Sequence, residues 1–390
     1  MYVAMNHLPV APGCKAAFEE QVGARARLVE LASGQRRQSC ALFTRACGED
    51  PIGMATPYDR WLLIEVPPPW PYDLWQSGRA PASVREVVRI AQECGLKVRV
   101  LAIAPDAEYS RPDRARVIDL RRPAGPFAVF ERREFVVPVA RVDELIGALF
   151  VHPAPGGASG GSNDLPSLAR GDLASFERYR QDAGHVRDLL VCTHGSVDPC
   201  CARFGVPLYQ TLRRDYAAAS GGRLRVWRVS HFGGHRFAPT ILDLPEGRSW
   251  AHVGPELLDC LVWRRGTPAA LRGHYRGWSG VGFFGQMVER EALVREGWPW
   301  IDYLKQGTLL TVDETPWPRG RPEPAPMFAE QAPQRAVMRL EYAAPDRTAA
   351  GAYTAVIEHQ GRVVGQGECG AAPWKRNTYA VTRLWKEPRP

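Results

Sequence analysis

The most constraining feature of this sequence is a set of four soft metal ligands in one short stretch. Cys192 and Cys201 have eight residues between them, and His231 and His235 have three. Thiolate sulfur and imidazole nitrogen together suit zinc, copper or an iron–sulfur cluster, and they do not suit magnesium or calcium. The spacing therefore predicts a metal or cluster site made of two ligand pairs, each on a loop that follows a strand.

The two loops have the composition that such a site needs. Residues 193–199 are rich in turn formers and have no apolar period, so they can wrap around a cofactor and direct backbone N–H groups at its sulfurs. Gly233 and Gly234 lie between the histidines. Glycine permits positive φ, and a Gly-Gly pair disfavours a helix. We therefore expect the second loop to fold back so that both imidazole rings face one point.

Hydrophobic patterning predicts the element order β-α-β-β-β-α around this motif. The expected strands are residues 189–191, 224–229, 240–244 and 249–253, and the expected helices are residues 206–219 and a last helix opened by Pro255. The N-terminal half predicts the same order, with strands at residues 61–66, 97–104, 115–120 and 127–139 and helices at residues 82–94 and 142–150. No cysteine or histidine pair follows the strands of that half, so we expect it to be a degenerate copy without a cluster.

At this motif the chain resembles the sucrase/ferredoxin-like proteins, whose C-terminal lobe is similar to thioredoxin-like 2Fe-2S ferredoxins. Those ferredoxins carry four cysteines as two pairs. Here Cys192 and Cys201 match the first pair, and His231 and His235 stand in place of the second. The resemblance is specific over residues 189–240 and looser elsewhere. It implies a 2Fe-2S cluster bound by these four residues and a role in one-electron transfer.

The expected fold class is α/β, with two thioredoxin-like lobes and a small β-rich C-terminal appendage. Residues 1–152 would form the first lobe, with a helix at residues 14–33 and an irregular stretch at residues 40–60. Residues 153–166, rich in Gly, Ser and Pro, would form a linker, and residues 167–280 the ferredoxin lobe. Residues 281–390 would form the appendage, with a helix at residues 282–304 and strands at residues 306–313, 335–342 and 352–367.

Two other functions fit parts of the same motif. A zinc-stabilised binding module would use the same four ligands, although structural zinc usually shows closer ligand pairs than Cys-x8-Cys. A thiol-dependent oxidoreductase would use the adjacent Cys200 and Cys201, although a Cys-x-x-Cys dithiol is absent. The cluster ligand could be either member of that vicinal pair, and the family spacing favours Cys201.

We also assign expected roles to other cysteines and to two arginines near the ligands. Cys40 and Cys47 form a second pair near Glu49 and are interpreted as ordinary buried cysteines, as is the isolated Cys369. Arg203 and Arg236 flank ligands and are expected on the surface, where a cation would favour a reduced cluster.

Two further residues lie in or near the ligand loops. His194 lies inside the first ligand loop and could support a ligand. Pro239 directly precedes an expected strand, where thioredoxin-like folds place a cis proline, so we predict a cis Ala238–Pro239 bond.

The histidine ligands predict a raised redox potential. Replacing two thiolates by neutral imidazoles removes two negative charges, which makes it easier to add an electron. Two-histidine Rieske centres accordingly lie at roughly −150 to +300 mV, against about −400 mV for plant-type ferredoxins. The second nitrogen of each imidazole can exchange a proton, so the potential of a cluster bound by His231 and His235 is expected to depend on pH.

Composition and charge limit the partners. The 390 residues contain no apolar run long enough to cross a membrane and no evident secretory signal, so we expect a cytoplasmic protein. The net charge of +8 is carried mostly by scattered arginines, which disfavours nucleic-acid binding. We interpret the arginines first as compositional bias, and a positive surface that attracts an acidic redox partner is the alternative. No catalytic constellation stands out, and an electron carrier with a redox partner protein is the expected function.

Overall fold

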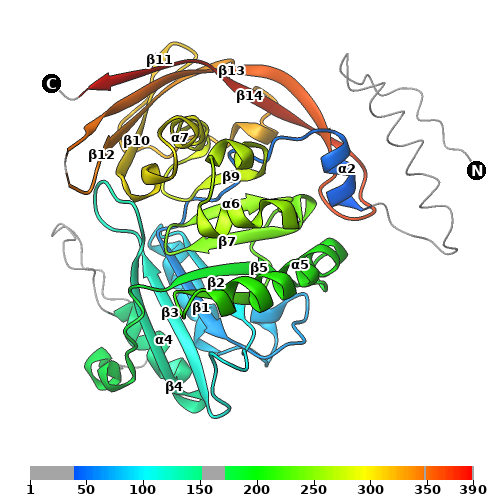
Figure 1. The fold of residues 1–390 in the computed structure, drawn as a ribbon, viewed down its shortest axis with the longest axis vertical. Helices are drawn as coiled ribbons and strands as arrows, with labels where there is room; N and C mark the ends of the chain where they lie inside the picture. Colours follow the sequence, from blue (N-terminus) through cyan, green and yellow to red (C-terminus); the bar gives the residue numbers. More distant parts are fainter. Residues whose placement is uncertain (1–38, 152–171, 347, 389–390) are drawn as a thin grey trace, which may run out of the picture.

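The computed structural model describes residues 39–151, 172–346 and 348–388. The helix expected at residues 14–33 and the linker expected at residues 153–166 lie outside these ranges. The described residues form a mixed α/β fold with a nine-stranded sheet and a five-stranded sheet (Figure 1).

The nine-stranded sheet has the order β4-β3-β1-β2-β6-β5-β7-β8-β9. Its strands are β1 (Arg60–Glu65), β2 (Val98–Ile103), β3 (Arg114–Arg121), β4 (Glu131–Pro138), β5 (Arg187–Cys192), β6 (Leu224–Val229), β7 (Thr240–Leu244), β8 (Arg248–Ala251) and β9 (Tyr275–Trp278). Each half has one parallel pair, β1 with β2 and β5 with β6, and its next two strands are antiparallel. The halves meet where Ile103 of β2 pairs with Val229 of β6.

The helices complete the same element order in both halves. They are α3 (Ser83–Glu93), α4 (Val142–Val151), α5 (Pro199–Thr211) and α6 (Leu258–Trp263). Both halves therefore have the predicted order β-α-β-β-β-α. The structure joins the halves through one continuous sheet, with strand β9 added at the far edge.

Strand β1 shows how the first half is buried on both faces. Leu62 and Ile64 pack with α3 and α4 in one hydrophobic cluster, whereas Trp61 and Leu63 belong to the main core. Alternate residues of a strand point to opposite faces, so a nearly continuous apolar run is needed at this central position.

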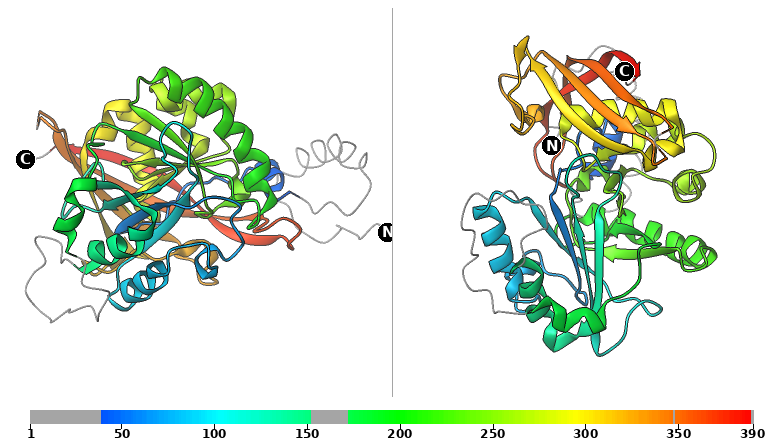
Figure 2. Two further views of the ribbon diagram at one scale, coloured as in Figure 1. Left: turned by 90° about the horizontal axis from the view of Figure 1, so that it is seen from below. Right: turned by 90° about the vertical axis from the view of Figure 1, so that its left-hand side faces the viewer.

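The five-stranded sheet packs on the second half through α7 (Phe283–Glu296), which contacts β9 on one side and β12 on the other. Its order is β11-β10-β12-β13-β14. Its strands are β10 (Leu304–Val312), β11 (Thr315–Pro316), β12 (Arg335–Ala343), β13 (Ala350–Gly365) and β14 (Trp374–Pro388). This sheet lies at the opposite end of the molecule from α3 and α4 (Figure 2).

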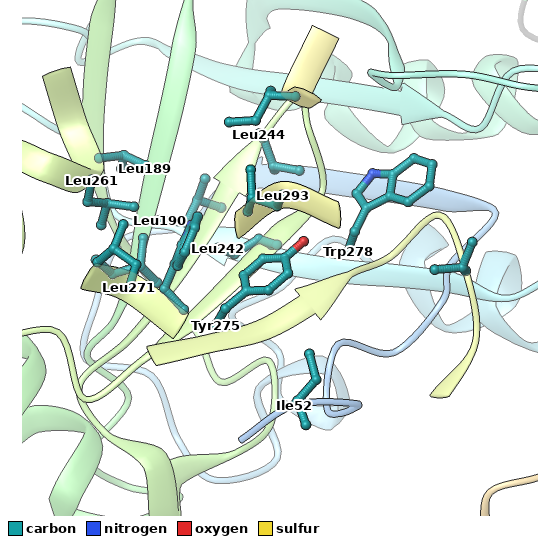
Figure 3. Packing of buried hydrophobic residues seen from close by; sticks show 14 of the residues in the cluster. Ile52, Leu189, Leu190, Leu242, Leu244, Leu261, Leu271, Tyr275, Trp278 and Leu293 are labelled. Atoms are coloured by element: carbon teal, nitrogen blue, oxygen red, sulfur yellow. The ribbon is translucent and has the colours of Figure 1, made fainter. Parts of the chain in front are cut away.

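One hydrophobic cluster runs through the second half and the C-terminal part. Figure 3 shows Leu190 of β5 and Leu242 of β7 near Tyr275 of β9 and Leu293 of α7, all of them in this cluster. The C-terminal sheet therefore shares its core with the second half of the large sheet.

Several predicted element boundaries were wrong, and end signals explain three of them. Residues 40–46 form α2 (Cys40–Ala46), because the Ser39 side chain accepts a hydrogen bond from the Leu42 N–H and caps it. Helix α5 begins at Pro199, before residue 206, because Asp198 caps it. Helix α7 ends at Glu296 and not at the predicted residue 304, because the next residue, Gly297, has φ 78° and ends the helix. Strands β9 and β14 were missed.

Candidate metal centre

Strand β5 and helix α5 bring the two predicted cysteine ligands together. Cys192 is the last residue of β5, and Cys201 lies in the first turn of α5 rather than in a loop. A Cβ atom on Gly205 would overlap the Cys192 carbonyl oxygen, so only glycine lets α5 lie this close to β5. Both cysteines are almost completely buried.

His231 completes a compact group with these cysteines. Its Nδ1 lies 3.8 Å from Cys192 Sγ and 3.6 Å from Cys201 Sγ. Among the described residues, the ligand atoms of Cys192, Cys201 and His231 all lie within 4.8 Å of one another and could hold a metal ion. The structure therefore gathers three of the four predicted ligands into one group.

The pKa values of the two thiols in this group are shifted in opposite directions. Burial raises the pKa of Cys192, but hydrogen bonds from Cys201 and His231 outweigh burial and hold the pKa well below its ordinary value. The hydrogen bond to Cys192, followed by burial, raises the pKa of Cys201. The pair therefore stabilises one thiolate without a metal, and a thiolate is the form that binds metals.

The glycine pair between the histidines is not helical, as predicted, but the two rings face different groups of residues. Gly233 has φ 97° and Gly234 has φ 81°, both in the region that favours glycine. A Cβ on Gly234 would also crowd the Arg276 guanidinium. His235 then opens a short 3-10 turn, η5 (His235–Phe237). The Ala238–Pro239 bond that follows is cis, as predicted.

Two arginines that the sequence analysis missed hold this loop by its carbonyls. Arg99 of β2 donates a hydrogen bond to the His231 carbonyl at 2.6 Å, and Arg276 of β9 donates one to the Gly233 carbonyl at 3.1 Å. Burial lowers the pKa of Arg276 to about 10, although Cys192 and Cys201 act in the other direction, so it stays protonated near neutral pH. Nothing in the sequence near either arginine signals these contacts.

His194 links the histidine loop to the segment around Pro71 through hydrogen bonds. Its Nδ1 accepts a hydrogen bond from the His231 backbone N–H at 3.2 Å, and its Nε2 lies 3.0 Å from the Pro71 carbonyl. This pair of contacts fixes the tautomer with the proton on Nε2. The ring is buried, and burial lowers its pKa. His194 thus positions His231 through the backbone.

His235, the fourth predicted ligand, lies beside this group and not in it. Its ring centroid is 5.2 Å from that of His231, and its Nδ1 lies 3.0 Å from Asp198 Oδ2. Asp198 is buried, and burial raises its pKa. Hydrogen bonds from His235 and from backbone N–H groups outweigh burial and keep the carboxyl ionised.

The vicinal cysteines face different groups of residues. Cys201 lies with Cys192, whereas Cys200 lies with Cys40 and Cys369. The interpretation of Cys40 and Cys369 as ordinary packing residues missed this second group. Their sequence neighbourhoods carry no ligand motif, so no local signal could have revealed it.

The two flanking arginines differ in exposure. Arg203 is exposed, as expected, but Arg236 is buried and paired with Glu49 at 3.0 Å. The expectation of a solvated Arg236 was wrong because Glu49, remote in sequence, supplies the counter-charge that burial of a guanidinium requires.

The family model of the sucrase/ferredoxin-like proteins matches residues 51–277. The chain belongs to the sucrase/ferredoxin-like family. The comparisons with curated proteins and with solved structures gave no match. All four predicted ligands lie inside the matched range of this sucrase/ferredoxin-like chain, and Cys40 and Cys369 lie outside it. In its described residues, no helix is long and apolar enough to cross a membrane.

Proposed function

We propose that this sucrase/ferredoxin-like chain is an electron-transfer protein with a 2Fe-2S cluster in mixed Cys2His2 ligation. Cys192 and Cys201 would bind one iron, and His231 and His235 the other. The observation that carries the proposal is the convergence of two buried thiols, at the end of β5 and in the first turn of α5, with the His231 imidazole in the loop after β6. Such a cluster accepts and releases one electron at a time.

The contact between His235 and Asp198 fits this assignment. Histidines that bind metals usually donate their other ring N–H to a carboxylate or carbonyl, which fixes the ring and its tautomer. His235 Nδ1 lies 3.0 Å from Asp198 Oδ2, which leaves Nε2 as the nitrogen available to iron. His231 presents Nδ1 to the two sulfurs. Each imidazole therefore has one nitrogen suited to coordination.

Positive charge around the ligand loop supports a reducible centre. Arg99 and Arg276 both donate to carbonyls of this loop, and Arg276 is fully buried beside the cysteines. A fixed cation in a medium of low dielectric stabilises added negative charge more strongly than it would in water. Together with neutral imidazole ligands, these arginines favour a potential above that of an all-cysteine relative, with a pH dependence from the second imidazole nitrogens.

The strand order supports thioredoxin-like lobes. In each half the first two strands are parallel, and the third is antiparallel to the first on its other side. This order is the one expected for a thioredoxin-like ferredoxin lobe and its degenerate copy. The free thiols of Cys192, Cys200 and Cys201 suit a reducing compartment, and we place the protein in the cytoplasm with a redox protein as its partner.

A single zinc ion is the rival occupant of this site. The separations of 3.6 and 3.8 Å between His231 Nδ1 and the sulfurs would suit ligands of one tetrahedral ion. The decisive experiment is anaerobic purification followed by a visible spectrum and assays of iron, sulfide and zinc. Two irons and two sulfides per chain are expected for wild type and for Cys94→Ser, which changes an exposed cysteine. A colourless protein without sulfide would refute the cluster.

A further inference from the structure

A second group of metal-ligating side chains lies next to the proposed cluster. Cys40, Asp198, Cys200 and Cys369 each offer a ligand atom, and these atoms lie within 4.8 Å of one another. Cys40 and Cys200 are buried with Asp198, and Cys369 is partly buried. The three cysteines come from α2, from the first turn of α5 and from the loop between β13 and β14. Figure 1 shows α2 beside that loop.

The separations within this group match those of ligands around one tetrahedral ion. Cys40 Sγ lies 3.7 Å from both Cys200 Sγ and Cys369 Sγ, and the last two sulfurs are 3.2 Å apart. Asp198 Oδ1 lies 3.8 Å from Cys40 Sγ and 3.2 Å from Cys369 Sγ. Sulfurs bound at ~2.3 Å to one tetrahedral zinc stand about 3.8 Å apart, so an ion would fit with only small shifts.

The surroundings are built for negative charge. The backbone N–H groups of Cys200 and Cys369 donate to the two oxygens of Asp198, at 2.8 and 3.0 Å. The Ser39 hydroxyl lies 3.2 Å from Cys200 Sγ. Cys200 also occupies the first turn of the 13-residue helix α5, where the helix dipole favours an anion.

Simple packing does not account for this arrangement. Two backbone N–H groups and His235 already satisfy the Asp198 carboxylate, but three cysteine sulfurs gathered beside it without a disulfide are more than helix capping requires. A disulfide between Cys200 and Cys369 would still leave the Cys40 thiol and the Asp198 carboxylate facing each other. A divalent cation with a preference for sulfur satisfies all four side chains at once.

We propose that Cys40, Cys200, Cys369 and Asp198 bind a zinc ion. This ion would tie α2 and the β13–β14 loop, both outside the range matched by the family model, to the helix that carries Cys201. Zinc has no redox chemistry of its own, so its role here is to fix these three segments. The site shares no ligand with the proposed cluster, although Asp198 and Cys40 lie 3.0 and 3.8 Å from Nδ1 of His235.

The test is metal analysis of the full chain, with iron, sulfide and zinc measured in the same samples. Wild type and Cys94→Ser should each contain about one zinc per chain. Cys369→Ser and Cys40→Ser should lose that zinc and keep their iron and sulfide. Cys192→Ser should lose iron and keep the zinc. Failure of the proposed cluster would change iron and sulfide alone, so the two failures are distinguishable.

A second measurement avoids any folding defect in the variants. Wild-type protein is treated with a chelator, and the released zinc and newly reactive thiols are counted with a metal dye and a thiol reagent. We expect the chelator to release one zinc from wild type. The thiols that then become reactive should be the same ones that already react in Cys369→Ser without chelator. The proposal would be overturned by any of three results. These are wild type without zinc, a zinc that is lost in Cys192→Ser but kept in Cys369→Ser, and a Cys200–Cys369 disulfide in freshly prepared protein.

Discussion

His235 Nδ1 lies 3.0 Å from Asp198 Oδ2, and this contact joins the two groups of soft ligands. The same carboxylate accepts the Cys200 N–H and lies beside the thiols of Cys40 and Cys369. Asp198 is therefore placed to orient a histidine of one proposed site while acting as a ligand in the other.

Replacing Asp198 by Asn should raise the midpoint potential of the cluster. The carboxylate makes the His235 imidazole more electron-rich, and the variant removes both that effect and a nearby negative charge. Because Asp198 is also a proposed zinc ligand, zinc is assayed in the same samples, and the prediction applies to protein that keeps its zinc. Asn caps helices as well as Asp does, so α5 should keep its start. We expect a higher midpoint potential by redox titration, with no change in Asp215→Asn, which alters an exposed aspartate. An unchanged or lower potential in Asp198→Asn would contradict this role.

Replacing Arg276 by Gln should lower the midpoint potential. The variant removes a buried cation near the cysteines and a donor to the Gly233 carbonyl. Arg276→Lys keeps the charge and should retain more of the potential. Arg203→Gln, at an exposed position, should have little effect because solvent screens that charge. Equal potentials in Arg276→Gln and wild type would show that this cation does not act on the site.

Replacing Gly205 by Ala should disturb the site without touching a ligand. The added Cβ would overlap the Cys192 carbonyl oxygen and push α5, with Cys201, away from β5. Alanine is intrinsically the better helix former by ~1 kcal/mol, so any destabilisation must come from the clash. We expect a loss of about 1–3 kcal/mol in unfolding free energy and reduced iron content. Gly273→Ala, which meets no atom within 4 Å, is the matched control and should resemble wild type.

The sequence predicted much of the large sheet and three converging ligands, because these depend on local patterns. The apolar runs of β1 and β5 are continuous, Cys192 ends β5, and His231 follows the neighbouring parallel strand β6. Side chains at the carboxyl ends of such strands meet at one edge of a sheet, and helix α5, which follows β5, brings Cys201 to the same edge.

The rest depends on long-range contacts that spacing does not encode. Cys369 meets Cys200 only because a C-terminal hairpin folds back across the molecule. Arg276 and Arg99 reach the histidine loop from β9 and β2, and no local motif marks either residue. Strand β14 was missed because charged residues interrupt its apolar positions, as in many loops.

Lys305 should make stability depend on pH. Its ammonium is buried and donates to the carbonyls of Trp300 and Ile301 at 2.9 and 3.1 Å. Burial lowers its pKa from 10.5 to about 7, despite nearby carboxylates. Between these two values the unfolded chain binds more protons than the folded chain, so the contribution of this lysine to stability rises with pH, by up to about 1.4 kcal/mol per unit.

Denaturant unfolding of wild type and Lys305→Met from about pH 7 to about pH 9 measures this effect. The difference in unfolding free energy, wild type minus variant, should increase across this range. A difference that stays constant would mean that Lys305 keeps an ordinary pKa in the folded protein.

The central claim is that His231 and His235 are ligands of a 2Fe-2S cluster, and midpoint potentials test it most directly. Wild type, His231→Cys and His235→Cys would be titrated anaerobically from about pH 6 to about pH 10, after iron and sulfide assays confirm a cluster in each. A thiolate in place of a neutral imidazole adds negative charge, so both variants should have a potential lower by roughly 100 mV or more and a weaker dependence on pH. If the three curves coincide, the histidines do not bind the cluster and the assignment is wrong.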